Sequence, residues 1–229
     1  PEILVHAGFD WLFIDSEHAP LGLADVAGLV QAGGKGAACI VRVPDHADRS
    51  IKNALDSGAD GIIVPMVNTA AQAEGIVAAS KYPPLGRRGL ASTRAHGYGA
   101  SFEEYLQRAN NDISVILQAE HVEAVKNIDS ITSVPGVDCI LVGPYDLSGS
   151  MGMLGQVTHP HVQEAIMNVS SACQKKGIPL GIFSPDPNLL VDYHRRGFTL
   201  LALGQDTTFL LDAARLSRQK LLDGIASLG

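Results

Sequence analysis

Acidic, basic and histidine side chains stand at the ends of short apolar runs in this sequence. The run WLFI is followed by Asp15, and Glu17 and His18 come shortly after it. A histidine with a carboxylate neighbour can act as a general acid or base. A second apolar run, ACIV, ends in Arg42, whose guanidinium could bind a substrate carboxylate or phosphate. An internal salt bridge from Arg42 to Asp15 or Asp56 would explain this arginine equally well.

Two further carboxylates occupy similar places later in the chain. Glu120 follows the run SVILQA, and Asp146 lies in GPYD, directly after the run CILV. One or two carboxylates, with the other positions left to water and substrate, are typical ligands of Mg²⁺ and Mn²⁺. Each acid alone could instead cap the helix that follows it. The occurrence of both on neighbouring segments favours a metal site.

Short β-branched runs alternate with longer helical patterns along the chain, and these elements must position the polar residues. We expect strands at residues 12–15, 38–43, 61–65, 114–118, 138–142, 179–183 and 200–204. We expect helices at residues 23–32, 49–57, 70–81, 122–130, 161–176 and 187–196, and a last one at about 208–226. Runs that are apolar throughout are typical of parallel strands covered on both faces. The carboxyl ends of such strands meet at one edge, where the polar residues would gather.

Strand–helix alternation predicts an α/β fold with a parallel sheet, and two architectures fit it. An eight-stranded (β/α)8 barrel needs one strand more than the seven, and we expect that strand to precede residue 1. The alternative is an open doubly wound sheet, but no GxGxxG motif follows a strand, which disfavours its dinucleotide-binding form. Residues 1–229 contain no linker composition, so we expect one catalytic domain.

The composition excludes several classes of protein. Of the 229 residues, 46% are hydrophobic and 18% are charged, and the formal net charge is −7. An acidic chain without a basic cluster is not expected to bind nucleic acid, and no apolar run is long enough to predict a membrane span. Three scattered cysteines without a CxxC pair favour free thiols in a reducing compartment, which predicts a cytoplasmic protein.

Several motifs stand in order along the chain, namely GFDWLFIDSEHAP, VRV, GIIVPMV, YPPLGRRG, ILQAE, VDCILVGPYDLSGSMG and the HP at residues 159–160. Together they resemble the motifs of the HpcH/HpaI family of class II, metal-dependent pyruvate aldolases. The resemblance covers essentially the whole chain, and the combination of ID-x-EH with GP-x-DLS is specific. It implies a (β/α)8 barrel whose first strand lies before residue 1. It also implies a homo-oligomer, commonly a hexamer built as a trimer of dimers that exchange the last helix.

The resemblance also implies roles for the polar residues at the strand ends. Glu120 and Asp146 correspond to the two metal ligands. Arg42 corresponds to the arginine that holds the substrate near its carboxylate or carbonyl. His18 corresponds to the acid–base histidine, and Asp15 to its carboxylate partner.

Further positions match residues around the family's substrate. Asp56 matches an acid that approaches the histidine from a neighbouring subunit. Gln118 would lie beside the water shell of the metal. The backbone near Pro144 and Tyr145, together with Ser184, would help to bind the carboxylate of pyruvate.

The resemblance implies reversible cleavage of a 4-hydroxy-2-oxo acid to pyruvate and an aldehyde, with Mg²⁺ or Mn²⁺, or alternatively Co²⁺, as the cofactor. The lysine positions independently disfavour a Schiff-base aldolase, because none falls at the end of an expected strand. These lysines are Lys35, Lys52, Lys81, Lys126, Lys175, Lys176 and Lys220. The aldehyde is not fixed by the sequence, and we expect residues 90–98 and 184–188, with a neighbour's surface, to select it.

Two other functions remain open at this point. A related lyase could act on a CoA thioester or on phosphoenolpyruvate, with Arg87, Arg88 and Arg94 binding phosphate groups rather than anchoring their loop. A barrel without activity could serve as an oligomeric scaffold or a metabolite sensor. Binding of a divalent metal would distinguish an aldolase from a scaffold.

Overall fold

The structure is a computed structural model of the chain, and it describes residues 1–34 and 36–228. Seven strands form one parallel sheet in sequence order. They are β1 (Trp11–Asp15), β2 (Ala38–Arg42), β3 (Gly61–Val64), β4 (Ser114–Ala119), β5 (Cys139–Val142), β6 (Leu180–Ser184) and β7 (Leu200–Leu203). Each expected strand is present, with its ends moved by one residue at most, so the strand predictions are confirmed.

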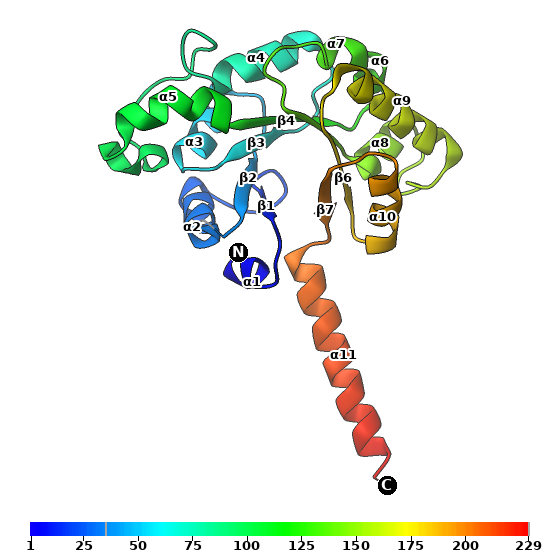
Figure 1. The fold of residues 1–229 in the computed structure, drawn as a ribbon. Helices are drawn as coiled ribbons and strands as arrows, with labels where there is room; N and C mark the ends of the chain where they lie inside the picture. The colour runs from blue at the N-terminus through cyan, green and yellow to red at the C-terminus, as the bar shows by residue number, and fades with distance from the viewer. Residues whose placement is uncertain (35, 229) are drawn as a thin grey trace.

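The helices lie outside the sheet and connect successive strands (Figure 1). They are α1 (Glu2–His6), α2 (Leu23–Gly33), α3 (Asp48–Asp56), α4 (Ala70–Ser80), the 3₁₀ helix η1 (Arg94–Gly99), α5 (Phe102–Asp112), α6 (Val122–Lys126), α7 (Ile128–Ile131), α8 (Pro144–Ser150), α9 (Pro160–Lys176), α10 (Pro187–Arg195) and α11 (Asp206–Ala226). The helix expected at 122–130 is divided into α6 and α7. Four elements, α1, η1, α5 and α8, were not predicted.

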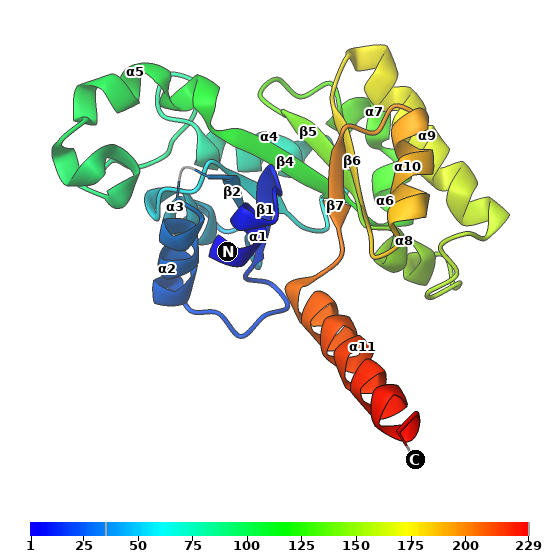
Figure 2. The ribbon, with the colours of Figure 1, turned by 60° about the horizontal axis from the view of Figure 1, so that its bottom comes forward.

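The sheet curves into a nearly closed barrel with its helices on the outside (Figure 2), which confirms the predicted (β/α)8-type architecture. The two edge strands approach each other, and the indole Nε1 of Trp11 in β1 donates a hydrogen bond to the carbonyl of Leu201 in β7 at 3.2 Å. The additional strand that we expect before residue 1 would lie outside the given sequence, so it stays a prediction.

Apolar side chains fill both faces of the sheet. All residues of β3 and β5 are buried, as expected for strands covered on both sides. A small cluster fills the barrel interior, formed by Ile40, Ile63, Ile116, Cys139 and Leu141. A larger cluster packs the helices onto the outer face. Removal of this area from water supplies most of the stabilisation of the fold.

The amino ends of the strands carry polar residues with structural contacts. Asp60, just before β3, accepts a hydrogen bond from the backbone amide of Cys39 in β2 at 2.7 Å. Asp138, just before β5, does the same for Val115 in β4 at 2.7 Å. The buried ammonium of Lys81 donates to two backbone carbonyls at this end. These contacts satisfy backbone groups between neighbouring strands and leave the carboxyl ends for chemistry.

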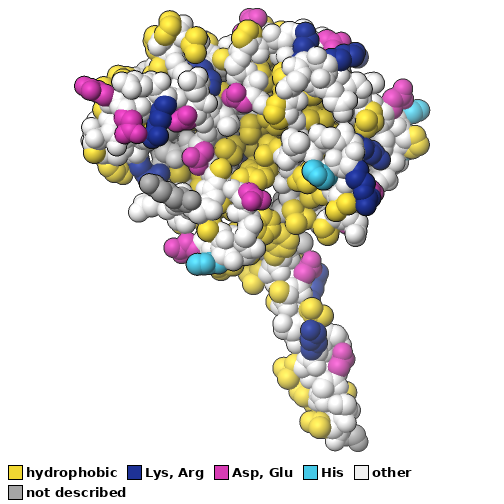
Figure 3. All heavy atoms as spheres, in the orientation of Figure 1, with side chains coloured by type: hydrophobic (Ala, Val, Ile, Leu, Met, Phe, Trp, Pro, Cys, Tyr) yellow, Lys and Arg dark blue, Asp and Glu magenta, His cyan; other side chains and the backbone are white. Residues whose placement is uncertain are grey.

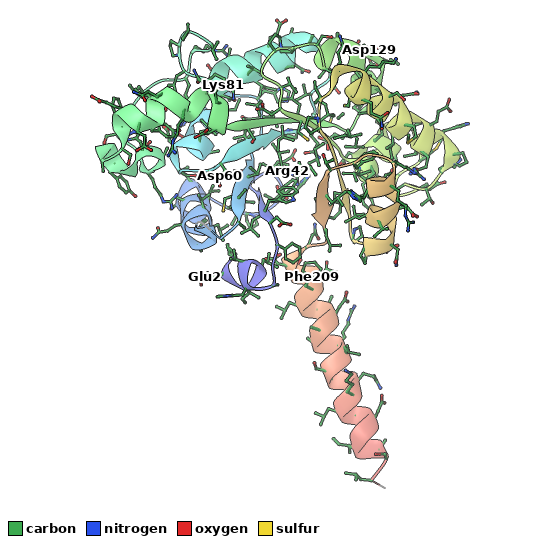
Figure 4. The ribbon with its side chains drawn as sticks, in the orientation of Figure 1. Glu2, Arg42, Asp60, Lys81, Asp129 and Phe209 are labelled. Atoms are coloured by element: carbon green, nitrogen blue, oxygen red, sulfur yellow. The ribbon has the colours of Figure 1, made fainter. Side chains whose placement is uncertain are left out.

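The last helix, α11, extends away from the body of the molecule (Figure 1). None of its residues is buried, and Figure 3 shows hydrophobic side chains along its length. Phe209 in its first turn packs against Phe9 with 6.0 Å between the ring centroids, which places the start of the helix beside α1 (Figure 4). Among the described residues, no helix is both long and apolar enough to cross a membrane.

Candidate active site

An ion-paired arginine occupies the carboxyl ends of the first two strands. Asp15 and Arg42 are direct partners in the register of β1 and β2. The guanidinium donates from Nε to Oδ1 of Asp15 at 2.9 Å and from Nη2 to Oδ2 at 2.6 Å, while Nη1 lies 3.1 Å from Glu17. Burial alone would raise the pKa of Asp15, but the hydrogen bond and charge of Arg42 outweigh it and hold that pKa below its ordinary value. The salt bridge from Arg42 to Asp15 therefore exists.

Arg42 keeps N–H donors that its ion pairs with Asp15 and Glu17 do not use. A guanidinium has five N–H donors, and both terminal nitrogens keep a donor beyond these contacts. Figure 4 shows the side chain within the curve of the sheet. Arg42 is thus fixed in orientation by two acids and can still bind an anionic group.

His18 lies at the solvent side of this cluster. Its side chain is 69% exposed, and Nε2 lies 3.7 Å from the carboxylate of Glu17. Asp15 accepts a hydrogen bond from the backbone amide of His18 at 3.2 Å, while both carboxylate oxygens of Asp15 face Arg42. The structure therefore gives the imidazole a different carboxylate neighbour, Glu17, from the Asp15 that the family resemblance implies.

Glu120 is a buried carboxylate at the end of β4. It is 3% exposed, its Oε1 accepts a hydrogen bond from the backbone amide of Met66 at 2.8 Å, and its Oε2 accepts one from the side-chain amide of Gln118. Burial raises the pKa of Glu120 to about 7; the Met66 amide opposes this rise, and the charges of Asp146 and Glu17 add to it. Asp146, which follows β5 in the first turn of α8, is thus close enough to affect the ionisation of Glu120.

Neither Glu120 nor Asp146 caps a helix. The N-cap of α6 is His121, whose ring accepts from the amide of Glu123, and the N-cap of α8 is Gly143. Asp146 lies inside the first turn of α8. The capping alternative is therefore wrong for both acids, and their carboxylates need another explanation.

The chemistry of this group fits a divalent cation. Three carboxylates, those of Glu17, Glu120 and Asp146, influence one another, and Oε1 of Gln118 is buried without a hydrogen-bond partner among the described residues. Within residues 1–34 and 36–228, no cluster of three or more His, Cys, Asp or Glu side chains is arranged as a metal site. Two carboxylates with water and substrate would be the ligand set, as Mg²⁺ prefers.

Some of the remaining predicted residues lie at the carboxyl ends of the strands, which we call the mouth of the barrel, and others lie elsewhere. Pro144 is buried at the start of α8. The ring of Tyr145 packs 6.3 Å from that of Phe183, and the buried hydroxyl of Ser184 accepts from the amide of Asp186 at 3.0 Å. These residues follow β5 or end β6, so they lie at the same edge as Glu120 and Asp146.

Asp56 lies elsewhere in the chain. It ends α3, shortly before β3 begins, so it belongs to the amino ends of the strands, opposite His18. Its carboxylate accepts from Arg88 at 2.8 Å. Residues 90–98, expected to select the aldehyde, lie in the same region, where Arg94 donates to the carbonyl of Ser57 at 2.9 Å. Within one chain these residues do not reach the mouth.

Comparisons with known proteins identify the family of this barrel. A model of the HpcH/HpaI aldolase/citrate lyase family matches residues 1–213. The chain belongs to this family. A hydroxypyruvate/pyruvate aldolase of Pseudomonas aeruginosa is 41% identical over 216 residues, 93% of this chain and 81% of the relative. A 4-hydroxy-2-oxovalerate aldolase of Rhodococcus jostii (strain RHA1) is 39% identical over 211 residues, 91% of this chain and 81% of the relative.

A solved structure supports the same assignment. A HpcH/HpaI aldolase/citrate lyase family protein from Burkholderia cenocepacia J2315 is 38% identical, with a TM-score of 0.92 over 96% of this chain and 88% of that one. The family resemblance of the motifs and the barrel architecture are thereby confirmed.

The basic residues outside the mouth have structural contacts in this HpcH/HpaI family member. Arg87 pairs with Asp48, Arg88 with Asp56, and Arg94 with a backbone carbonyl, so all three anchor the loop between α4 and α5. Lys35 lies outside the described residues. The other lysines, Lys52, Lys81, Lys126, Lys175, Lys176 and Lys220, lie in helices or directly after one.

Three contacts of the site were not predicted. Glu17 was named with Asp15 and His18 at the end of the first strand, but its ion pair with Arg42 was not predicted. The backbone amide of Met66 has no side-chain signature. A side chain at Gly143 would collide with the Glu120 carboxylate and the Gln118 amide, so the glycine of GPYD lets β5 approach these groups.

Proposed function

We propose that this protein is a metal-dependent aldolase that cleaves a 4-hydroxy-2-oxo acid to pyruvate and an aldehyde, and catalyses the reverse addition. The observation that carries the proposal is the buried Glu120 carboxylate, which shares the barrel mouth with Asp146 and the ion-paired Arg42. Two relatives at about 40% identity are aldolases of hydroxypyruvate/pyruvate and of 4-hydroxy-2-oxovalerate. HpcH/HpaI aldolases are generally metal-dependent.

Glu120 and Asp146 would hold the cation, with Gln118 beside it. When bound, Mg²⁺ or Mn²⁺, or alternatively Co²⁺, supplies Lewis-acid charge that stabilises the negative charge developing on a 2-oxo acid. The other steps depend on side chains of this chain. Arg42 binds the substrate near its carboxylate and ketone and adds positive charge as the ketone oxygen becomes negative. The backbone after Pro144 and Tyr145, with Ser184, completes the wall around the carboxylate.

His18 is the acid–base group of this proposal. In cleavage His18 accepts the proton of the C4 hydroxyl, and the C3–C4 bond breaks. The electron pair of that bond moves through C3 toward the C2 ketone. The aldehyde leaves, and protonation at C3 gives pyruvate. The carboxylate of Glu17, 3.7 Å away, stabilises the imidazolium that forms, while Asp15 keeps Arg42 in place.

We also propose a cytoplasmic homo-oligomer in which α11 packs on a neighbouring subunit. Its exposed apolar residues support this assembly, namely Leu210, Leu211, Leu216, Leu221, Leu222 and Ile225. A hexamer, as a trimer of dimers, would bring Asp56 and residues 90–98 of one chain toward the His18 of another. The cysteines Cys39, Cys139 and Cys173 are free and buried, which supports a reducing compartment.

The alternatives have weaker support. A thioester or phosphoenolpyruvate lyase would need basic residues for phosphate groups, and Arg87, Arg88 and Arg94 anchor their own loop instead. A scaffold without activity would not need a buried acid whose ionisation burial opposes.

The test is exchange of the methyl protons of pyruvate with deuterated solvent, which needs no knowledge of the aldehyde. We expect exchange with Mg²⁺ or Mn²⁺, loss of it after chelation, and loss in Glu120→Gln and Asp146→Asn. Asp129→Asn, which changes an exposed carboxylate on α7 (Figure 4), is the control and should exchange normally. Folded protein that gives no exchange with any of these metals would refute the aldolase assignment.

A further inference from the structure

The turn after β3 has a backbone conformation that its residue type disfavours. Met66 has φ of +52°, in the left-handed region, which non-glycine residues rarely adopt because the Cβ atom crowds the backbone. Such strain persists only where the surroundings hold it, and it concentrates at functional sites. Met66 follows β3 at the carboxyl end of the sheet, which is the edge of the candidate active site.

Three hydrogen bonds hold this turn from two directions. The ring Nε2 of His46, in the loop between β2 and α3, lies 2.6 Å from the carbonyl oxygen of Pro65. On the other side, the backbone amide of Val67 donates to the carbonyl of Gln118 at 3.2 Å. The amide of Met66 donates to Oε1 of Glu120 at 2.8 Å. A carbonyl can only accept, so Nε2 of His46 carries the proton in this contact.

We propose that His46 is a positioning residue of the metal centre: it holds the Pro65 carbonyl, and thereby aims the Met66 amide at Oε1 of Glu120. This inference rests on the proposed metal role of Glu120. The ring of His46 bonds the Pro65 carbonyl, whereas the hydrogen bonds to the Glu120 carboxylate come from Met66 and Gln118. His46 acts through the backbone of the strained turn.

The contact on Oε1 completes the orientation of the Glu120 carboxylate. Oε2 accepts from Gln118 and lies against Gly143, so a donor is present at each oxygen. A carboxylate held at both oxygens cannot rotate freely, and its remaining lone pairs keep one direction. Contacts of this kind to a ligand side chain commonly change metal affinity by about 10- to 100-fold, because they fix the ligand before the metal binds.

The experiment measures Mn²⁺ binding by calorimetry to the full chain, with no substrate present. His46→Ala removes the donor to Pro65 and should weaken Mn²⁺ binding by about tenfold. His46→Gln places an amide N–H where it can reach the same carbonyl, and should restore most of the affinity.

His194→Ala is the matched control. His194 also contacts a backbone carbonyl through its ring, that of Phe198 at 3.1 Å, but it lies at the end of α10, away from Glu120. Its loss should leave Mn²⁺ affinity unchanged. If His46→Ala lowers stability, His46→Asn is compared with His46→Gln instead. The asparagine side chain is too short for its amide to reach the Pro65 carbonyl, so the His46→Asn variant should bind Mn²⁺ less tightly than the His46→Gln variant.

The outcomes separate this inference from the proposed function. If the wild type does not bind Mn²⁺, or if Glu120→Gln binds it equally well, the proposed metal site is wrong. If the wild type binds, Glu120→Gln does not, and His46→Ala and His46→Asn bind as tightly as the wild type, then the positioning role of His46 is wrong. A weakened His46→Ala with a restored His46→Gln supports it.

Discussion

The carboxylate of Glu120 is buried, and this makes the stability of the metal-free protein depend on pH. The folded pKa is about 7, against an ordinary value of 4.5, so the folded state binds this proton more tightly than the unfolded state. The stabilisation from Glu120 is therefore complete below about pH 4.5 and is lost as the pH rises through about 7. At about 1.4 kcal/mol per pKa unit, the loss in the free energy of unfolding is roughly 3–4 kcal/mol.

Urea unfolding in chelator at about pH 5 and about pH 8 checks this prediction. Glu120→Gln has no proton to lose in this interval, so its stability should fall less than that of the wild type. Mn²⁺ should restore the stability of the wild type at the higher pH, because the metal favours the ionised carboxylate. Equal pH dependence in the two proteins would show that Glu120 ionises normally.

At this scale, the sequence predicts which residues gather at the mouth better than it predicts their pairing. Asp15, Arg42, Glu120 and Asp146 were found because they end or closely follow apolar strands. The choice between Glu17 and Asp15 as the neighbour of His18 depends on strand register and on rotamers, which residue types do not encode. The Met66 amide was missed for a related reason, since any residue except proline supplies a backbone donor.

At the scale of elements, the loop between α4 and α5 is anchored by adjacent arginines in different surroundings. Arg88 is fully buried and pairs with Asp56, whereas Arg87 is 53% exposed and pairs with Asp48. Replacing Arg88 by Met leaves the carboxylate of Asp56 without its cation, and we expect a loss of about 3–5 kcal/mol in the free energy of unfolding. Arg87→Met should cost less than about 1 kcal/mol.

Urea unfolding of the two variants provides the comparison. Because the substitutions are the same and the positions adjacent, the difference between them reports the buried contacts of Arg88, which are the pair with Asp56, the hydrogen bond to Tyr105 and the stacking on Tyr82. Similar losses in both would mean that the Arg88–Asp56 pair contributes no more than a surface contact.

The elements that were missed differ in the signal that they carry. In α5, apolar residues recur at helical spacing at Phe102, Tyr105, Leu106 and Ala109, so this helix could have been predicted from its periodicity. The segment PYDLSGS of α8 contains five residues of types usual in turns, although proline at the first helical position is a start signal that could have identified it. The strands were predicted well because their apolar runs are short and bounded by polar residues.

At the scale of the whole molecule, α11 packs on its own chain through Phe209 in its first turn and exposes leucines along the rest of its length. Leu216→Glu combined with Leu221→Glu should disrupt the proposed contact with a neighbouring subunit, since each buried leucine contributes about 1.5–3 kcal/mol. We expect the subunit dissociation constant to rise at least about 100-fold. Analytical ultracentrifugation measures it, with Lys220→Gln on the same helix as the control. An unchanged assembly would exclude α11 from the interface.

The contact between Trp11 and Leu201 has an optical consequence. The chain contains one tryptophan, and its indole N–H bonds to the carbonyl of the last strand while the residue itself belongs to the first. The tryptophan fluorescence of the protein, excited at a wavelength that the tyrosines do not absorb, therefore comes from a single indole located where the two ends of the sheet meet. Separation of those ends would expose the indole to water and shift its emission to longer wavelength, so an unlabelled sample reports opening of the barrel directly.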